Sequence, residues 1–467
     1  MKPVDEVLKQ IKLPFKLHDY QIEDINKLAK AKSCGCYSAM GLGKTVVGTL
    51  IGIYKLLHGY NTVVVLVPAS VQPQWNEFLT SLGVKVCNYK GSPAERKKMD
   101  LDADFLLMSY QIYQKDYERL KKVKDPYFLI DEATVMCNRQ NLLYKLTTGG
   151  LYKKKVKGPG GTINTKKIQY EAVSESFCLL TGTPINKPTD AYGLIKITSP
   201  DTYSSYYRFE LAHVDKVDNF GNPLTYKGLD VLNENLRKNA VIREVSGHLD
   251  LPEKVYNVVQ YDLSPAHLKL YKKVLSEEMI IIDDKIVVDA LEANKLYHLA
   301  QELVLCPEIA GLESDPAGLE LLDTVVGGVK QAIIFNHHTS INSKIMKRYD
   351  GGGCFGDITW ANQTAFVEKF KAKELKVLVA NTKSAGVGLN LQICNQVIFS
   401  ELPITSRDFR QAEARCWRQG QKERVIVTVL VARKTIQQTL LRKIMERDEV
   451  SKQVLRSKKS LREELFC

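Results

Sequence analysis

The chain has 467 residues, 44% hydrophobic and 25% charged, which is ordinary globular usage and predicts two or three domains with cores of their own. The formal net charge of +13 favours a polyanionic partner, either nucleic acid or an anionic surface. No apolar run approaches the roughly 18 residues of a membrane span and the N-terminus lacks a signal-peptide core, so we expect neither a secreted, a membrane-spanning nor a disordered protein.

Short β-branched and apolar runs alternate with longer helical stretches, twice along the chain. The runs are residues 35–39, 62–68, 104–110, 127–133 and 176–182, and then 331–337, 376–382, 396–401 and 424–431. Near-continuous apolar strands separated by helices are typical of parallel sheets that are covered on both faces. The sequence therefore predicts an α/β protein with two successive lobes, lobe 1 over 1–250 and lobe 2 over 251–467.

The stretch from about 185 to 320 has a different composition, because it is rich in helix formers, tyrosines and charges. We expect helical insertions here, near 200–250 in lobe 1 and near 264–320 in lobe 2. Residues 229–244 are predicted to be helical, and only 251–264 resembles a strand.

The segment SAMGLGKT follows a predicted strand and opens a predicted helix. This is the context of a phosphate-binding loop, in which Gly41 and Gly43 let backbone N–H groups approach a polyphosphate at a helix N-terminus. Lys44 is predicted to reach the β and γ phosphates of ATP, and the Thr45 hydroxyl to bind Mg²⁺. Ser38 stands where the simple pattern has its first glycine. The predicted nucleotide-binding residues of this loop are Met40, Gly41, Leu42, Gly43, Lys44 and Thr45.

An acidic pair, Asp131 and Glu132, directly follows the apolar strand of 127–130. A carboxylate at the C-terminal end of a strand lies where α/β sheets bind ligands. Asp131 is predicted to hold Mg²⁺, and Glu132 to polarise the attacking water. An acidic pair alone is usually a solvated loop, but a phosphate loop upstream makes it half of a nucleotide-binding pair.

Further segments stand in a fixed order along the chain: LHDYQ at 17–21, VPASVQPQW at 67–75, TGTPIN at 181–186, AIIFNHH at 332–338, NTKSAGVGLNL at 381–391 and QAEARCWRQGQ at 411–421. Together with MGLGKT and DEAT, they resemble the motifs of superfamily 2 nucleic-acid motors of the Swi/Snf-like branch, across nearly the whole chain. The resemblance implies two RecA-like lobes with parallel sheets, helical insertions between them, and ATP with Mg²⁺ as cofactors. It also implies that Gln21 contacts adenine and that Gln411 is a nucleotide-sensing glutamine.

Two positions depart from the family pattern. The DEAT motif ends in Thr134 where the family usually has histidine, so coupling between the lobes through that side chain is not predicted. Around 356–370 the expected arginine is absent and Gln363 stands nearby, so the usual contact there is unsupported.

Arg415 and Arg418 are three residues apart, so a helix would place them on one face. They belong to a lobe without a phosphate loop of its own. Guanidinium groups supplied from a second lobe act as arginine fingers, which are worth roughly 10³–10⁵ in the rate of phosphoryl transfer. We therefore predict catalytic roles for both arginines, and the alternative is a solvated basic helix face.

Nucleic-acid contacts are implied by the resemblance, which places several motifs along the phosphate backbone. The candidates by position are Ser70, Gln72, Ser109, Tyr110, Thr382, Lys383 and Ser384. Ordinary loop capping is the alternative for each of them. Trp75 and Trp417 are expected to be buried against the sheets rather than to stack on bases.

A basic segment over 151–170 contains a Gly-Pro-Gly-Gly turn and no acidic residue. Two β-compatible arms about such a turn predict a hairpin that projects from lobe 1, and a disordered basic loop is the alternative. We expect it to grip the nucleic-acid backbone or to wedge at a junction where strands part. Its predicted contacts are Lys153, Lys154, Lys155, Lys157, Lys166 and Lys167.

Cysteine and histidine spacing indicates no zinc motif. The ten cysteines include no CxxC pair and the eight histidines no HxxxH pair, although His337 and His338 are adjacent. We therefore expect reduced thiols in a cytosolic protein and no metal held by protein side chains alone.

The resulting hypothesis is an ATP-dependent translocase or helicase on duplex or branched DNA, similar to compact phage or bacterial motors that remodel forks and migrate branches. Such a motor implies DNA repair, replication or recombination in a bacterial or phage-infected cytoplasm. Its expected partners are DNA and the proteins of those processes, and no membrane is expected. The oligomeric state is not predicted, and a monomer is compatible with the sequence. The alternatives are an ATP-gated nucleic-acid clamp that does not step, and an RNA helicase, which the TGTPIN and NTKSAGVGLNL segments disfavour.

Overall fold

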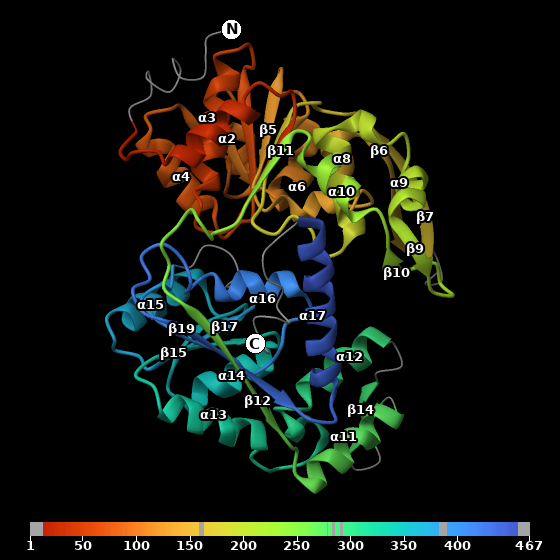
Figure 1. Ribbon diagram of the computed structural model, residues 1–467, viewed down its shortest axis with the longest axis vertical. Coiled ribbons are helices and arrows are strands. Elements are labelled where there is room, and N and C mark those ends of the chain that lie inside the picture. The colour runs from red at the N-terminus through yellow and green to blue at the C-terminus, as the bar shows by residue number, and fades with distance from the viewer. Residues whose placement is uncertain are drawn as a thin grey trace. The chain divides into compact units, whose positions relative to one another are not determined.

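The computed structural model describes residues 13–157, 163–277, 279–282, 285–289, 293–382 and 390–455. They form two compact units, each a sheet flanked by helices (Figure 1). The first unit runs to Leu249, the second is Asp250–Glu449, and residues 450–455 group with the first. No helix in the described ranges combines the length and the apolar character needed to cross a membrane.

The first unit is built on a seven-stranded sheet in which every neighbouring pair is parallel. Its strands are β1 (Cys34–Ser38), β2 (Thr62–Val67), β3 (Val86–Asn88), β4 (Phe105–Ser109), β5 (Pro126–Ile130), β8 (Phe177–Leu180) and β11 (Ala240–Arg243). They lie in the order β11-β1-β8-β5-β2-β4-β3. β1, β2, β4, β5 and β8 are buried at every position, which is why these runs read as continuous apolar stretches.

Helices cover both faces of this sheet. The helices of the first unit are α2 (Asp19–Leu28), α3 (Lys44–Leu56), α4 (Gln72–Ser81), α5 (Pro93–Lys98), α6 (Tyr110–Leu120), α7 (Leu142–Thr148), α8 (Ala191–Thr198), α9 (Tyr206–His213) and α10 (Leu229–Arg237). Val64 and Leu66 share one core with α6, α7, α8 and α10. On the other face α3 lies close, since a Cβ at Gly48 would come within 2.7 Å of Leu180. A larger residue at Gly48 would require Leu180 or α3 to shift.

The second unit repeats this plan with a six-stranded parallel sheet. Its strands are β12 (Lys254–Tyr261), β15 (Ala332–Asn336), β16 (Gly352–Cys354), β17 (Val377–Asn381), β18 (Gln396–Phe399) and β19 (Val425–Ala432), in the order β12-β19-β18-β15-β17-β16. Its helices are α11 (Pro265–Glu277), α12 (Ala293–Glu302), α13 (Ala317–Gly327), α14 (Thr339–Arg348), α15 (Trp360–Lys371), α16 (Ser406–Glu413) and α17 (Ile436–Leu455). One core joins the sheet to α15, α16 and α17, and a second joins it to α11–α14.

Three short antiparallel pairs complete the described chain. They are β6 (Gly150–Lys157) with β7 (Ile163–Tyr170), β9 (Val214–Val217) with β10 (Pro223–Tyr226), and β13 (Met279–Ile282) with β14 (Lys285–Asp289). The first pair is the basic segment, whose turn lies outside the described residues. Its two arms pair in register from Gly150↔Tyr170 to Lys157↔Ile163.

The α/β class and both parallel sheets are confirmed, but the expectation that 185–320 holds a single strand is wrong. β9–β11, β13 and β14 also lie in this stretch. β11 falls within the predicted helix 229–244, because α10 ends at Arg237 and the short apolar run that follows pairs with β1 from Gly35↔Ala240 onward. Pairing with β1 at the edge of the sheet therefore outweighs the helix propensity of these residues.

Candidate functional site

Three motif-bearing strands are direct neighbours in the sheet of the first unit. The SAMGLGKT loop follows β1, the TGTPIN segment follows β8, and the DEAT motif follows β5, in the sheet order β1-β8-β5. The carboxyl ends of parallel strands meet at one edge of a sheet, where α/β proteins bind ligands. The topology therefore brings together three segments that lie far apart in the sequence.

The glycine-rich loop bends as a phosphate-binding loop requires. Gly41 has φ +85° and Gly43 has φ +72°, a left-handed conformation that favours glycine. α3 begins at Lys44, directly after Gly43, so its first N–H groups point toward the loop. Lys44 Nζ donates to the Ala39 carbonyl oxygen at 3.1 Å, which curls its side chain over the loop. Thr45 lies in the first turn of the same helix.

Gln21 supports this loop from α2. Its side chain is 5% exposed, and its Nε2 donates to the Leu42 carbonyl oxygen at 3.3 Å. Its Oε1 accepts from the His18 N–H at 3.0 Å. A Cβ at Gly43 would lie only 2.2 Å from Gln21 Nε2, so Gly43 is required here for space as well as for its φ. The adenine contact of Gln21 stays a prediction.

The Asp131 carboxylate is held in a defined orientation. Its Oδ2 accepts from Trp75 Nε1 at 2.8 Å, and its Oδ1 accepts from the Glu132 N–H at 2.9 Å. The Tyr110 hydroxyl donates to the Asp131 carbonyl oxygen. Burial, with the neighbouring Asp131 and Glu132 carboxylates, raises the pKa of Tyr110 well above its usual value, so this hydroxyl stays a donor.

Strain and close packing mark the rest of this edge. Glu132 has φ +48°, a left-handed conformation that is costly for a residue with a side chain. Gly182 lies against the glycine-rich loop, because a Cβ there would come within 3.3 Å of Lys44 Nζ and 3.2 Å of Met40 Cγ. Thr134 belongs to a short 3-10 helix, Ala133–Cys137, and its hydroxyl donates to the Glu132 carbonyl oxygen at 3.5 Å.

The contacts of Trp75 were only partly predicted from the sequence. Its burial against the sheet was expected and is confirmed, with 2% of the residue exposed. Its contact with Asp131 was not expected. A buried indole N–H requires an acceptor. The Asp131 carboxylate, which directly follows an apolar strand, could have been predicted as that acceptor.

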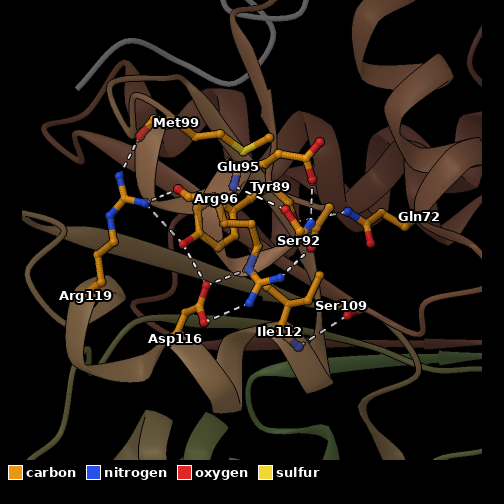
Figure 2. A network of polar contacts seen from close by, with 11 residues as sticks. Gln72, Tyr89, Ser92, Glu95, Arg96, Met99, Ser109, Ile112, Asp116 and Arg119 are labelled. Carbon is orange, nitrogen blue, oxygen red and sulfur yellow. Dashed lines mark hydrogen bonds and ion pairs between the residues drawn. The ribbon is translucent and has the colours of Figure 1, made fainter.

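Three residues predicted to contact the nucleic-acid backbone have hydrogen bonds inside the first unit, and Figure 2 shows two of them, Gln72 and Ser109. Gln72 is 6% exposed, and its Nε2 donates to Asn88 Oδ1 at 2.9 Å, which ties α4 to β3. Ser109 is 3% exposed and caps α6 by accepting from the Ile112 N–H at 3.4 Å. Tyr110 points to Asp131, as described above. The nucleic-acid contacts of these three residues stay predictions, and the capping alternative is observed for Ser109.

The same network contains a buried ion pair between α5 and α6 (Figure 2). Arg96 Nε donates to Asp116 Oδ2 at 2.7 Å, with side-chain exposures of 6% and 19%. The Tyr89 hydroxyl donates to the same carboxylate at 2.8 Å. The Arg96 hydrogen bond lowers the pKa of Asp116. The ion pair therefore anchors α5 beside the helix that carries Tyr110.

Replacing Asp116 with asparagine should destabilise the folded protein by about 3–5 kcal/mol, because Arg96 would stay buried without its carboxylate. Since the folded pKa is lowered, the stabilisation is present above the unfolded pKa of about 3.9 and is lost as pH falls below it. Urea unfolding at several pH values measures both effects. Asp102→Asn, which removes an exposed carboxylate, is the matched control and should change stability by no more than about 0.5 kcal/mol.

The remaining nucleic-acid candidates differ in accessibility. Ser70 is half-buried in the turn that leads into α4. Thr382 is fully buried after β17, and Lys383 and Ser384 lie outside the described residues. In the β6–β7 hairpin, Lys153, Lys154, Lys155, Lys166 and Lys167 are exposed. Lysines face each other directly at Lys153↔Lys167 and Lys154↔Lys166, and like charges placed so destabilise a hairpin unless an anion offsets them.

The arginine-rich motif lies in the second unit but not on a helix face. α16 ends at Glu413, and Arg415 and Arg418 lie in the turns that follow, so the helix-face expectation is wrong. The turn is closed by the Arg415 N–H, which donates to the Ala412 carbonyl oxygen at 3.1 Å, and the Arg415 carbonyl oxygen accepts from the Leu391 N–H at 3.1 Å. Arg415 is 8% exposed. Arg418 donates to Asn390 Oδ1, and burial lowers the pKa of its guanidinium.

Other residues of the second unit have structural contacts. Gln411 lies on α16, upstream of the two arginines. Trp417 packs against the core as expected, and its Nε1 donates to the Pro252 carbonyl oxygen at 2.8 Å. Gln363 donates to the carbonyl oxygens of Phe355 at 3.1 Å and Ile358 at 2.8 Å, which fixes the loop before α15.

Two domain families match the chain. The SNF2-related domain matches residues 20–156 and 161–306, and the helicase conserved C-terminal domain matches residues 319–420. The chain is 24% identical to the mouse (Mus musculus) chromodomain-helicase-DNA-binding protein 1-like over 94% of this chain and 50% of that protein. It is 26% identical to an ATP-dependent helicase of Mycoplasma pneumoniae over 89% of this chain and 39% of that protein.

A solved structure, the Sulfolobus solfataricus SWI2/SNF2 ATPase core in complex with dsDNA, is 20% identical over 98% of this chain and 99% of that chain, with a TM-score of 0.44. The chain spans half or less of the length of the two curated relatives named above. The family match covers more than half of the chain and includes the loop, the acidic motif and the TGTPIN segment. The chain therefore belongs to the SNF2-related family, the Swi/Snf-like branch of the superfamily 2 helicases.

Proposed function

We propose that the chain is an ATP-driven motor that moves along DNA. The observation that carries this proposal is the edge of the first sheet, where the phosphate-type loop after β1, the segment after β8 and the oriented Asp131 after β5 adjoin. Family membership and the net charge of +13 support the choice of a nucleic-acid track. The names of the relatives include DNA binding and ATP-dependent helicase, which supports DNA and ATP as the substrates.

ATP and Mg²⁺ fit the residues present. The N–H groups at the start of α3 and the Lys44 ammonium are suited to the phosphates. Mg²⁺ takes oxygen ligands, and the Thr45 hydroxyl and the Asp131 carboxylate supply them. When bound, the ion would neutralise phosphate charge. Trp75 and the Glu132 N–H hold the Asp131 carboxylate in one orientation, and Glu132 itself is proposed to position the attacking water.

Arg415 and Arg418 are proposed to act on the transferring phosphoryl group when the lobes close. Each cycle would then shift backbone contacts along one DNA strand. The preference for duplex or branched DNA, with roles in fork remodelling, branch migration, repair, replication or recombination, is the finer part of the proposal. A motor on such DNA would work in the cytoplasm of a bacterium or a phage-infected host.

The rate of ATP hydrolysis with different activators tests this function. We expect duplex or forked DNA to raise kcat strongly, and RNA to raise it little. Stimulation by RNA alone would identify an RNA helicase instead. Hydrolysis that DNA leaves unchanged, with ATP-dependent DNA binding, would identify a clamp that does not step.

Replacing Trp75 with phenylalanine should lower kcat by roughly 10- to 100-fold, because it removes a hydrogen bond to a charged group worth about 1.5–3 kcal/mol. Phenylalanine keeps an aromatic ring at position 75, so the side chain stays buried. Steady-state kinetics at several Mg²⁺ concentrations measure the effect. Trp417→Phe also removes an indole hydrogen bond, the one to Pro252, and should leave kcat near the wild-type value. Equal losses in both variants would show that Trp75 acts only through stability.

Replacing Lys153, Lys154, Lys166 and Lys167 with glutamine should flatten the salt dependence of duplex binding. Each lysine paired with a phosphate contributes roughly 0.9 to the slope of log K against log salt. We expect impaired unwinding of forked DNA and unchanged ATP hydrolysis without DNA. Lys122→Gln with Lys124→Gln, two exposed lysines between α6 and β5, is the control. Wild-type slope and unwinding in the hairpin variant would leave it a surface loop.

A further inference from the structure

A group of histidines in the second unit lies apart from the phosphate loop and the acidic motif. Within the described ranges, one ring nitrogen from each of His298, His337 and His338 lies within 4.8 Å of the other two. His298 comes from α12, and the other two form the link between β15 and α14. All three belong to one compact unit. We propose that this group binds a single divalent transition-metal ion, with Zn²⁺ as the preferred one.

The Glu401 carboxylate fixes the orientation of this group. Glu401 is fully buried just after β18, and its Oε2 accepts from the backbone N–H groups of His337 at 2.8 Å and His338 at 2.9 Å. Its Oε1 accepts from His338 Nδ1. Because Nδ1 is engaged with Glu401, Nε2 is the nitrogen of His338 that is placed to bind a metal.

The same nitrogen contacts a second histidine. His338 Nε2 and His298 Nδ1 share a hydrogen bond of 3.0 Å, and a metal ion bound by both nitrogens would replace it with release of its proton. Two nitrogen ligands on a tetrahedral zinc ion, each about 2.0–2.1 Å from it, lie about 3.3 Å apart, so this pair needs little movement to share an ion. The rings of His298 and His337 are stacked with centroids 5.6 Å apart, which places the third imidazole beside the pair.

The arrangement also has the outer contacts of a metal site. A histidine that ligates a metal usually donates its other ring nitrogen to a carboxylate, as His338 does to Glu401. α12 is held against this edge independently of the histidines, since Gln301 Nε2 donates to the Leu402 carbonyl oxygen at 3.2 Å and the Ser340 hydroxyl donates to Glu302. The ligands therefore come from elements that are already fixed in place.

Donor chemistry selects the ion. Three neutral imidazoles suit Zn²⁺, Cu²⁺ or Ni²⁺ rather than Mg²⁺ or Ca²⁺, which take oxygen ligands. Three histidines leave a fourth tetrahedral position for water. The bound ion would link the inserted helix α12 to the carboxyl end of β15, and this inference does not rest on the proposed motor function.

Zinc binding by the full chain, after removal of any histidine tag and treatment with a chelator, tests the inference. We expect about one equivalent of Zn²⁺ by competition with a chromogenic chelator, and visible bands of low-symmetry Co²⁺ when cobalt replaces zinc. Zinc at about 100 times its dissociation constant should raise the unfolding midpoint by about 5–10 °C.

Single-ligand variants make the assignment specific. His298→Ala and, separately, His337→Ala should weaken Zn²⁺ binding by at least roughly tenfold and abolish the cobalt bands, with wild-type circular dichroism. His58→Ala, which changes a histidine just after α3 in the first unit, should bind as the wild type does. Binding of far less than one equivalent by the wild type, or undiminished binding by both ligand variants, would overturn the inference and, in the second case, assign the ion to other residues.

Discussion

Replacing Lys44 with alanine is expected to lower kcat for ATP hydrolysis by at least about 10²–10³-fold while the protein still folds and binds DNA. The ammonium belongs to the glycine-rich loop, where Nζ reaches the Ala39 carbonyl oxygen and lies close to Gly182. Its proposed role is to meet phosphate charge that grows in the transition state. The exposed lysines proposed to meet DNA are on β6 and β7, so catalysis and DNA affinity should separate.

Three measurements on the Lys44→Ala variant check this separation: the steady-state ATPase rate with saturating duplex DNA, the DNA affinity, and the urea midpoint. Lys30→Ala, which changes an exposed lysine just after α2, is the matched control and should behave as the wild type does. DNA-stimulated hydrolysis at a wild-type rate in Lys44→Ala would contradict the assignment of the phosphate loop.

Replacing Arg418 with alanine should lower kcat by about 10³-fold and change ATP affinity much less, since an arginine finger acts on the transition state. Arg418 is preferred to Arg415 for this test, because Arg415 is 8% exposed and its loss would disturb packing. The Asn390 contact holds the Arg418 guanidinium in the second unit. Burial lowers the pKa of Arg418, but an arginine remains charged at neutral pH.

Single-turnover hydrolysis and nucleotide binding, measured on the same protein, distinguish the two roles. Lys422→Ala removes an exposed cation close to Arg418 and should leave both quantities unchanged. A collapse of ATP affinity with normal turnover of the bound fraction would make Arg418 a ground-state ligand and contradict the finger role.

The parallel sheets could be predicted because their strands are apolar at nearly every position. Val63–Val67 and Leu106–Met108 are buried on both sides of the sheet. Their sequences therefore lack the alternation of apolar and polar residues that is typical of a strand with one exposed face. β11 could not be predicted, since its short apolar run follows a helix and its conformation depends on an edge provided by β1, far away in the sequence. The short hairpins β9–β10 and β13–β14 were missed for a different reason, because each is a short local pairing within a stretch that is rich in helix formers and charges.

The site shows the same division between local and tertiary information. The loop with Gly41 and Gly43 was predictable, because their positive φ values follow from a motif contained in eight consecutive residues. The inward orientation of Gln72 depends on Asn88, and the roles of Trp75 and Tyr110 depend on Asp131. These partners are set by the order of strands in the sheet. Spacing along the chain therefore indicated which residues matter but not what each side chain contacts.

The histidine group illustrates the limit of spacing rules. Adjacent His337 and His338 were noted in the sequence, but His298 lies on a distant helix and Glu401 follows another strand. Zinc motifs are recognised by ligands close together in sequence, and this group is assembled by tertiary structure alone. The proposed zinc site therefore disagrees with the expectation from the sequence that no metal is held by protein side chains alone.

Displacement of a third strand from a DNA triplex tests the central claim, ATP-driven movement along DNA, most directly. We predict that the wild-type protein removes the strand when ATP is hydrolysed, that a non-hydrolysable ATP analogue does not support removal, and that Lys44→Ala is inactive. Absence of displacement by a wild-type protein whose ATPase is stimulated by the same duplex would contradict the motor and favour the clamp.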